Sequence, residues 1–545
     1  MTTSTDQKTH SIRFIKGGQI VTLDNVPPSR TLLEVLREDM CSMATKEGCG
    51  EGDCGACTVV LSEAVAGKLT HKAVNSCIRL AHSVDGMAVW TAEDIVRPKN
   101  ELHPVQEALV QCHASQCGFC TPGFVMSLFA MYQNHTCKSR AITREMAQAE
   151  LSGNLCRCTG YRPIFDAAQM LDKLPLVKLD EVDLLLKLEL FTRTLPGLEA
   201  DLNLKTGYFS PLSLDKLLEL RAQNPDAQIV AGTTDVGLWI TKQHRQYDHI
   251  IDVTRAIELK RIEDFKDHIA IGAAVTLNGA FAALCNDRPQ LHDFAARFAG
   301  LPVRNSGTLG GNVANGSPIG DSMPLLIALN ATVVLMSVRG SREMPLEQLY
   351  TGYRQNVMAV DEILAWIKVP KPGRSLPSLS PKGEGAIPIP ASGGGTESPP
   401  TPASGSNIPI PSPAGGGLGW GLPEFLRIYK ISKRFDDDIS AICLGINLHI
   451  DKGIIVKASI GVGGVAATPA RAIKTEAVCA DKPWDRSTID HAITVLRAEF
   501  TPISDMRASS AYRRVVLGNL LERYWLESQG VQNINLESFE LDSAA

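Results

Sequence analysis

The spacing of hydrophobic residues near the N-terminus predicts a small domain that combines strands with a helix. Residues 12–24 predict two short strands, because apolar side chains recur on either side of a pair of glycines. Thr31 and Glu34 form a capping-box pattern before a run of leucine and valine, which predicts that a helix begins there. A strand is predicted over residues 58–61, after a glycine-rich loop. Residues 10–97 are therefore expected to form one α+β domain.

The pattern changes to a helical period over residues 104–171, where apolar residues recur three and four positions apart. Farther along, strands and helices alternate, with glycine-rich turns at 231–237 and 305–316. The chain is therefore predicted to be a multidomain α+β protein. Its further parts are a helical domain at 98–172, a charged linker at 173–206, a strand-and-helix domain at 207–370, an insertion at 371–422 and a C-terminal domain at 423–530.

Residues 371–422 follow neither period. Pro, Gly and Ser dominate this stretch, and an Ile-Pro-Ile-Pro sequence occurs twice, each time followed by a triple glycine. Such a composition cannot bury enough apolar surface to offset the entropy that is lost on ordering. A disordered insertion is predicted here.

The C-terminal domain has clearer signals. Alternating apolar residues on both sides of the turn at 451–453 predict a β-hairpin. Helical patterns follow at 487–500 and 510–526. This part of the chain is therefore expected to be α+β as well.

Composition and charge narrow the class of protein. The formal net charge is −5, with 44% hydrophobic and 21% charged residues, so neither nucleic acid nor an anionic membrane is favoured as a partner. The first ten residues lack the apolar core of a secretion signal, and no run of about 18 apolar residues predicts a spanning helix. A cytoplasmic protein is therefore expected. Of the 14 cysteines, 11 precede residue 160, and this crowding favours metal binding over disulfides.

Four of these cysteines have the spacing of a plant-type ferredoxin. Cys49, Cys54 and Cys57 form a C-x4-C-x2-C run, and Cys77 follows in the next part of the chain. This arrangement is typical of a 2Fe–2S cluster, whereas zinc more often uses paired C-x2-C units. The surrounding glycines permit positive φ angles and let backbone N–H groups point at sulfur. A 2Fe–2S cluster is predicted here.

A second group of four cysteines leaves two kinds of metal site open. Cys117 and Cys120 form one pair, and Cys156 and Cys158 form another. Four thiolates in two pairs can hold zinc, although a C-x-C pair is less usual there. Each pair stands beside a predicted helix end, where N–H groups can face an anionic site. The residues alone leave zinc and a 2Fe–2S cluster as alternatives.

Two glycine-rich loops in the middle of the chain are candidate nucleotide-binding elements. No G-x-G-x-x-G motif follows a predicted strand, so a Rossmann-type site is not indicated. Residues 229–237 instead predict a strand, a polar turn and a helix, whose amides and hydroxyls can cradle a pyrophosphate. A second loop spans residues 304–312 and leads into residues 317–321. Each loop alone is a weak signal, because glycine turns are common.

The sequences at 116–123 and 153–161, which follow a ferredoxin-like cluster loop, resemble the iron–sulfur domains of the xanthine dehydrogenase (molybdenum hydroxylase) family. The resemblance covers residues 11–528 in the family's domain order, and the insertion at 371–422 departs from it. It implies four domains: a β-grasp ferredoxin-like 2Fe–2S domain, a helical-bundle 2Fe–2S domain, a two-part α+β FAD-binding domain and an α+β C-terminal flavoprotein domain.

The resemblance also implies which residues bind cofactors. Gln116 would contact the pterin cofactor across a subunit boundary, and residues 430–438 match a loop near the isoalloxazine ring. The second 2Fe–2S cluster would be held by Cys117, Cys120, Cys156 and Cys158. FAD would be bound by a pyrophosphate loop and five further positions, namely Ile229, Val230, Ala231, Gly232, Thr233, Thr234, Asp235, Val236 and Gly237, then Phe298, Thr308, Asp321, Leu364 and Lys430.

A division of labour between subunits is implied as well. The family's molybdenum-binding region is larger than any segment left in this chain, so a separate large molybdopterin-binding subunit is expected, in a complex such as a dimer of heterodimers. That partner would oxidise hypoxanthine and xanthine to urate, and no residue of this chain would catalyse the hydroxylation. Electrons would pass through the second and then the first cluster to FAD, which reduces NAD.

Two other functions remain open at this point. One is the iron–sulfur and flavin subunit of a molybdenum hydroxylase that acts on an aldehyde or an N-heterocycle. The other belongs to a different class, a non-catalytic electron carrier or zinc scaffold. The absorbance of a bound flavin would distinguish the two molybdenum hydroxylase functions from a zinc scaffold, because a zinc scaffold has no visible absorbance.

Overall fold

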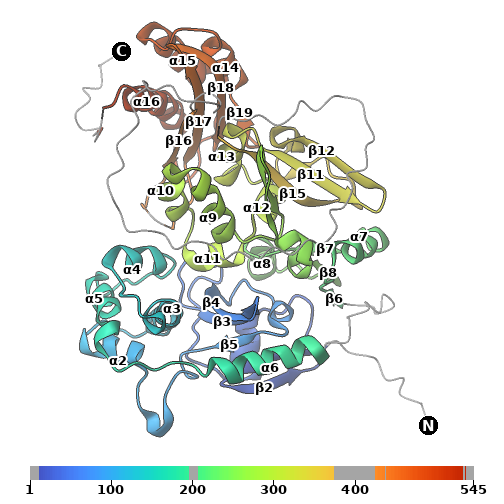
Figure 1. Ribbon diagram of the computed structural model, residues 1–545, viewed down its shortest axis with the longest axis vertical. Coiled ribbons are helices and arrows are strands. Elements are labelled where there is room, and N and C mark those ends of the chain that lie inside the picture. The colour runs from blue at the N-terminus through green and yellow to red at the C-terminus, as the bar shows by residue number, and fades with distance from the viewer. Residues whose placement is uncertain (1–10, 195–206, 373–423, 436, 532–533, 535–545) are drawn as a thin grey trace.

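The computed structural model describes residues 11–194, 207–372, 424–435, 437–531 and 534. The insertion predicted at 371–422, apart from its first two residues, lies outside the described residues, as do residues 195–206 of the predicted linker. The described chain is a multidomain α+β fold, as predicted. Figure 1 shows the cysteine-rich domains at the bottom, residues 207–370 in the middle and the C-terminal domain at the top.

The N-terminal domain is a five-stranded sheet packed against one short helix. Its strand order is β2 (Gln19–Leu23), β1 (Ile12–Lys16), β5 (Ala88–Trp90), β3 (Thr58–Val65) and β4 (Lys68–Asn75), with β1 and β5 parallel and the other neighbours antiparallel. The helix is α1 (Leu32–Glu34), continued by the π-helical turn η1 (Val35–Asp39).

The three local predictions for this domain are confirmed, and β3 covers the strand predicted at 58–61. The two N-terminal strands pair as an antiparallel hairpin. The hydroxyl of Thr31 accepts a hydrogen bond from the N–H of Glu34 at 3.2 Å, and the Glu34 carboxylate accepts one from the N–H of Thr31 at 2.8 Å. This capping box starts the helix that the sequence predicts.

The helical domain packs directly against this sheet. It consists of α2 (Pro104–Gln111), α3 (Thr121–Asn134), α4 (Arg144–Glu150) and α5 (Arg162–Met170). One hydrophobic core contains Ile15, Val60 and Trp90 of the sheet together with Phe124 and Phe129 of α3. Because the two domains share this core, neither buries its apolar face without the other.

The segment predicted as a linker contains a helix, α6 (Glu181–Thr194), which lies along the N-terminal sheet in Figure 1. Leu184, Leu188 and Phe191 are buried in the shared core. Their spacing of four and three residues places them on one face of the helix. The first part of the connection is thus packed onto the cysteine-rich domains.

Residues 207–370 form two sheets. A parallel sheet contains β6 (Gly207–Phe209), β8 (His249–Asp252) and β7 (Gln228–Val230), and the helices α7 (Leu214–Gln223) and α8 (Val236–Thr241) connect these strands. An antiparallel sheet contains β12 (Gly340–Pro345), β11 (Thr332–Ser337), β15 (Ile363–Pro370), β10 (His268–Gly272) and β9 (Ile262–Asp264). The remaining elements are α9 (Leu277–Asp287), α10 (His292–Ala296), α11 (Leu301–Ser306), α12 (Leu309–Asn315), α13 (Ser322–Ala328) and the short strands β13 (Tyr350–Gly352) and β14 (Gln355–Asn356).

The C-terminal domain is an antiparallel sheet flanked by helices. Its strands are β16 (Glu424–Ile431), β17 (Ile442–Asp451), β18 (Ile454–Gly463) and β19 (Ala470–Arg471), and its helices are α14 (Ile473–Cys479), α15 (Arg486–Glu499) and α16 (Ser510–Ser528). The predicted hairpin is confirmed, with Lys452 and Gly453 at φ angles of 48° and 79° in the turn. The two predicted helices coincide with α15 and α16.

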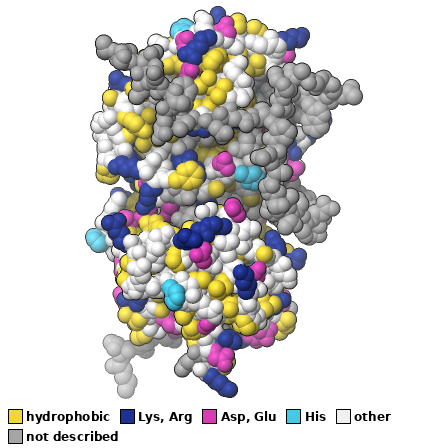
Figure 2. Space-filling view, turned by 90° about the vertical axis from the view of Figure 1, so that its left-hand side faces the viewer, with side chains coloured by type: hydrophobic (Ala, Val, Ile, Leu, Met, Phe, Trp, Pro, Cys, Tyr) yellow, Lys and Arg dark blue, Asp and Glu magenta, His cyan; other side chains and the backbone are white. Residues whose placement is uncertain are grey.

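The surface carries charges of both signs. Basic and acidic side chains are both spread over the face shown in Figure 2. This mixture agrees with the small net charge of −5. Within the described parts of the chain, no helix has the length and apolarity needed to cross a membrane.

Replacing Phe129 should destabilise both N-terminal domains together. Its buried ring lies 6.0 Å from the ring of Trp90 and 5.4 Å from that of His103, measured between centroids. Removing a buried aromatic ring costs about 3–5 kcal/mol, so Phe129→Ala should lower the free energy of unfolding by this order in a denaturant titration. Val182→Ala, on the exposed face of α6, should change it by less than about 0.5 kcal/mol. Hydrogen exchange that loses protection in α3 but keeps it in β3 and β4 would contradict a shared core.

Candidate functional site

The first cysteine group is one compact cluster of thiols. Cys49, Cys54 and Cys57 lie in the loop between η1 and β3, and Cys77 follows β4. The sulfurs of Cys57 and Cys77 are 3.3 Å apart, and both side chains are buried. The sulfur of Cys49 accepts hydrogen bonds from the backbone N–H groups of Glu51 and Cys54, each at 3.4 Å. The fold therefore brings the four predicted ligands together.

The loop that carries these thiols depends on glycine. A Cβ atom at Gly48 would lie 2.8 Å from the sulfur of Cys54, and Gly52 has a φ of +82°. The pKa of Cys49 is lowered, because the thiols of Cys54 and Cys77 donate hydrogen bonds to its sulfur. The pKa values of Cys54 and Cys77 are raised, because their thiols donate these hydrogen bonds and because burial disfavours their thiolates.

The second cysteine group joins two loops of the helical domain. Cys117 and Cys120 precede α3, and Cys156 and Cys158 lie between α4 and α5. The thiol of Cys120 contacts that of Cys156, and the thiol of Cys117 contacts that of Cys158. Each contact therefore joins one cysteine of the first loop to one of the second. Thr159 donates to the sulfur of Cys156 from its N–H at 3.4 Å and from its hydroxyl at 3.3 Å. The side chains of Cys117 and Cys158 are exposed.

Both groups fit a two-iron centre better than a single metal ion. A 2Fe–2S core takes two thiolates on each iron. The second group presents two pairs of thiols, and in the first group Cys57 lies beside Cys77 and Cys54 beside Cys49, whose sulfur also accepts from Cys77. This pairing favours the predicted clusters over the zinc alternative, in which all the ligands surround one ion.

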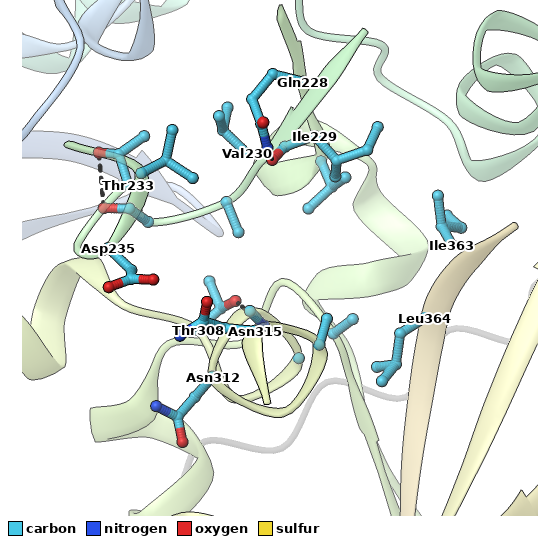
Figure 3. A pocket seen from close by; sticks show the side chains of 18 of the residues that line it. Gln228, Ile229, Val230, Thr233, Asp235, Thr308, Asn312, Asn315, Ile363 and Leu364 are labelled. Atoms are coloured by element: carbon cyan, nitrogen blue, oxygen red, sulfur yellow. Dashed lines mark hydrogen bonds between the residues drawn. The ribbon is translucent and has the colours of Figure 1, made fainter. Parts of the chain in front are cut away.

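A cavity of about 440 Å³ lies between the two sheets of residues 207–370. It is lined by β7 and the turn after it, by α12 with its N-cap Thr308, and by the start of β15 (Figure 3). In this view Ile363 and Leu364 face the polar turn of Thr233 and Asp235 from the opposite side. An apolar wall that faces polar turns suits a nucleotide cofactor.

The lining contains most of the residues predicted to bind FAD, namely residues 229–236, Thr308 and Leu364. Gly237 lies behind this loop, where a Cβ atom would be 2.5 Å from the carbonyl oxygen of Ile78. Phe298 is placed away from the lining, in the hydrophobic core.

Asp321 and Lys430 come together outside the cavity lining and join two domains. Lys430 in β16 forms an ion pair with Asp321 at the start of α13, with 3.0 Å between nitrogen and oxygen, and both side chains are buried. The hydroxyl of Ser440 donates to the same carboxylate oxygen at 2.8 Å. The other carboxylate oxygen of Asp321 is buried and has no hydrogen-bond partner among the described residues. An unpaired buried oxygen of this kind fits a contact with a polar cofactor group.

Two backbone loops touch beside the cavity. A Cβ atom at Gly232 would lie 1.8 Å from the carbonyl oxygen of Ser306 and 2.6 Å from the Cα of Gly307. The hydroxyl of Thr308 accepts a hydrogen bond from the N–H of Gly311 at 2.9 Å and so caps α12. The two glycine-rich loops singled out in the sequence are therefore packed onto each other.

The loop after β16 links the C-terminal domain to the first cysteine group. Arg434 donates to the carboxylate of Asp53 at 3.1 Å, and Asp437 accepts a hydrogen bond from the N–H of Gly300 at 2.7 Å. Burial raises the pKa of Asp437 to about 7, and the Asp53 carboxylate contributes in the same direction. Asp436, which belongs to the same acidic run, lies outside the described residues.

Several lining residues carry little or no signal in the sequence. Trp239, Asn312, Asn315 and Met358 all line the cavity. Asn312 ends the second glycine-rich loop, so that loop is the signal for it. Trp239 and Met358 face the cavity only because separate elements pack together, and no local pattern reports such packing.

Four family models match successive parts of the chain. They are the 2Fe-2S iron-sulfur cluster binding domain at residues 14–81, the [2Fe-2S] binding domain at 91–169, the FAD binding domain in molybdopterin dehydrogenase at 203–372 and the CO dehydrogenase flavoprotein C-terminal domain at 427–528. The chain therefore contains 2Fe–2S-binding and FAD-binding domains.

Xanthine dehydrogenases are similar to the chain over almost its whole length. That of Drosophila subobscura is 30% identical over 95% of this chain and 39% of its own, and xanthine dehydrogenase 1 of Arabidopsis thaliana is 29% identical over 98% of this chain and 41% of its own. The chain thus spans about two-fifths of the length of these relatives. Among solved structures, quinoline 2-oxidoreductase from Pseudomonas putida 86 is 21% identical, with a TM-score of 0.47, over 60% of this chain and 97% of that chain.

Gly232→Ala should abolish flavin binding without unfolding the chain. The added methyl group would lie 1.8 Å from the oxygen of Ser306, so the two loops beside the cavity must separate. The ratio of flavin absorbance to protein should fall at least tenfold, while circular dichroism stays unchanged. Gly279→Ala in α9 is the control, because its Cβ would meet no atom closer than 3.4 Å. A variant Gly232→Ala with full flavin content would show that this contact does not shape the site.

The raised pKa of Asp437 should make folding depend on pH. An unfolded aspartate titrates near pH 4, so the folded chain binds the extra proton and stability falls as pH rises from about 4 to about 7. Asp437→Asn can keep the hydrogen bond from Gly300 but carries no charge, and it should be more stable than the parent chain above pH 7. Thermal unfolding of both chains at pH 5 and pH 8 measures the difference. An equal difference at both pH values would contradict the raised pKa.

Proposed function

Because this chain belongs to the molybdenum hydroxylase family, as the family's iron–sulfur and FAD-binding region, we propose that it is the electron-transfer subunit of a cytoplasmic xanthine dehydrogenase. In this proposal a large molybdopterin-binding subunit oxidises hypoxanthine and xanthine to urate, and this chain delivers the electrons to NAD. The named relatives support the choice of purine substrate, since they are xanthine dehydrogenases. The complex is proposed to be a dimer of heterodimers.

The proposed ligands follow from the two cysteine groups and the cavity. Cys49, Cys54, Cys57 and Cys77 hold the first cluster, and Cys117, Cys120, Cys156 and Cys158 hold the second. When bound, the clusters carry single electrons, and FAD accepts electrons singly and releases a hydride to NAD. The residues of the chain bind these groups, exclude water from them and set the distances between them.

The observation that supports this function most strongly is the position of α8. Its first residue, Val236, lines the cavity, while Leu238 packs against the buried Cys57 and Cys77. At its other end, the hydroxyl of Thr241 donates to the carbonyl oxygen of Gly50 at 2.8 Å.

The residue that follows α8 strengthens the same link. The ammonium group of Lys242 donates to the backbone carbonyl oxygen of Cys49. The thiolate of Cys49 is one of the proposed ligands of the first cluster. A helix of six residues is about 9 Å long. One short helix thus contacts both the flavin cavity and the first cysteine loop, as electron transfer between them requires.

Burial supports the proposed order of the two clusters. Cys57 and Cys77 are buried beneath α8, whereas Cys117 and Cys158 are exposed. Phe119, between the ligands of the second group, is 49% exposed, and Gln116 beside them is exposed as well. The second cluster therefore offers a surface to a partner, and the first lies next to the flavin. Electrons enter at the second cluster and leave through FAD.

The contacts proposed for FAD are those of the cavity and the buried ion pair. Residues 229–237, Thr308 and Leu364 surround the nucleotide part. The free carboxylate oxygen of Asp321, with Lys430 beside it, meets a polar group of the same cofactor. Phe298 is proposed as a further flavin contact, as the resemblance implies, and its ring also packs in the adjoining hydrophobic core.

The test is anaerobic titration of the full chain, purified with its cofactors. NADH should reduce both FAD and the clusters of the chain alone, whereas xanthine should do so only when the molybdopterin subunit is present. Cys57→Ser should lose about half of the iron, because each of the two clusters holds two irons. Cys479→Ser, a buried cysteine of the C-terminal domain, should keep all of it.

Two results would overturn the proposal. Parent protein without iron, acid-labile sulfide and flavin would leave only a scaffold or a zinc protein. A complex that carries all its cofactors but oxidises an aldehyde or an N-heterocycle, and not xanthine, would place the chain in another enzyme of the family.

A further inference from the structure

The two cysteine loops touch through their backbones. The N–H of Leu155 donates a hydrogen bond to the carbonyl oxygen of Cys54 at 3.0 Å. Cys54 belongs to the first cysteine group, and Leu155 immediately precedes Cys156 of the second. A single hydrogen bond therefore links Cys54, a proposed ligand of the first cluster, to Leu155, the residue next to a proposed ligand of the second.

Asn154 fixes this contact from the side. Its amide nitrogen donates to the carbonyl oxygen of Gly55 at 3.1 Å and to the hydroxyl of Thr58 at 3.2 Å. Its amide oxygen accepts a hydrogen bond from the hydroxyl of Ser127 at 2.5 Å. The side chain is 3% exposed, so no solvent can replace these partners. One amide thus ties the first cysteine loop, β3 and α3 to the second cysteine loop.

The surrounding glycines leave no room for the loops to shift closer or to accept a side chain. A Cβ atom at Gly55 would lie 2.2 Å from the carbonyl oxygen of Gly153, and one at Gly123 would lie 2.2 Å from that of Gly55. The ring of Phe119 also reaches the first loop, 3.5 Å from the place of a Cβ at Gly48. The separation of the loops is therefore set by backbone contact, and the hydrogen bonds of Asn154 hold it there.

We propose that Asn154 is a positioning residue that holds the two cysteine loops at their backbone contact distance, and so maintains the electron transfer rate between the two iron–sulfur centres. This inference rests on the proposed function, in which the two cysteine groups hold the clusters. Each transfer oxidises one cluster by one electron and reduces the other by one electron, with no proton or bond involved. Outer groups that hold ligand loops in place determine the geometry of a metal site.

Other residues at this position cannot do the same. Aspartate would keep the acceptor for Ser127 but would place a carboxylate oxygen against the carbonyl oxygen of Gly55. Alanine would remove all three hydrogen bonds, while Thr58 still donates to Gly55 at 2.7 Å and Leu155 still donates to Cys54. The Asn154→Ala chain therefore keeps part of the contact and can fold, but its loops are free to separate.

The test is electron paramagnetic resonance of the full chain with both clusters reduced. The magnetic splitting between two paramagnetic clusters depends steeply on their distance, and it does not respond to a general loss of stability. Asn154→Ala and Asn154→Asp should show a smaller splitting, together with at least a fivefold slower transfer between the clusters after flash reduction. Iron, sulfide and flavin contents should equal those of the parent chain.

The matched control is Asn447→Ala. Asn447 is also a buried amide, but it lies in β17 and donates to Glu424. It should leave the splitting unchanged. Unchanged splitting and rate in Asn154→Ala, with both clusters present, would overturn the inference and leave the proposed function intact, whereas parent protein without clusters would overturn the proposed function itself. If Asn154→Ala loses a cluster, Ser127→Ala, which removes only the hydroxyl that orients the amide, decides the matter by the same splitting.

Discussion

Close approach between backbone segments that lie far apart in the sequence is the constraint on which the cofactor sites depend. Such an approach is possible only where no side chain intervenes. Cβ atoms at Gly232, Gly55 and Gly237 would all lie between 1.8 and 2.5 Å from a carbonyl oxygen of another loop. The first contact lies beside the cavity, the second joins the two cysteine loops, and the third seats α8 on the first of them. The second and third contacts thus connect the flavin site to both cysteine groups.

The parts that could be predicted from the sequence are those in which neighbouring residues determine the structure. The turn at Lys452 and the capping box at Thr31 depend on a few adjacent residues, and both are found as expected. The cysteine groups were also recognisable, because the chemistry of a two-iron core requires fixed spacings within each loop. The two glycine-rich loops around Gly232 and Thr308 were visible for the same reason, although neither alone indicated a cofactor.

Contacts between distant segments could not be predicted in this way. The packing of Leu238 against Cys77 joins residues more than 150 positions apart, and hydrophobic periodicity carries no information about such a partner. The packing of Phe298 against Phe281 and Phe294 is another contact of this kind, which local periodicity could not indicate. The helix α6 was hidden because further leucine and valine residues on its exposed face blur the apolar stripe that Leu184, Leu188 and Phe191 form.

A gene that encodes this chain can be divided or recombined safely only where few apolar contacts cross the break. A break between β5 and α2 would separate Trp90 from Phe129 and leave both halves with uncovered hydrophobic surface. The shared core extends to Phe191 at the end of α6. The two cysteine-rich domains and α6 are thus one heritable module, and domain shuffling during evolution or in the laboratory has to move them together.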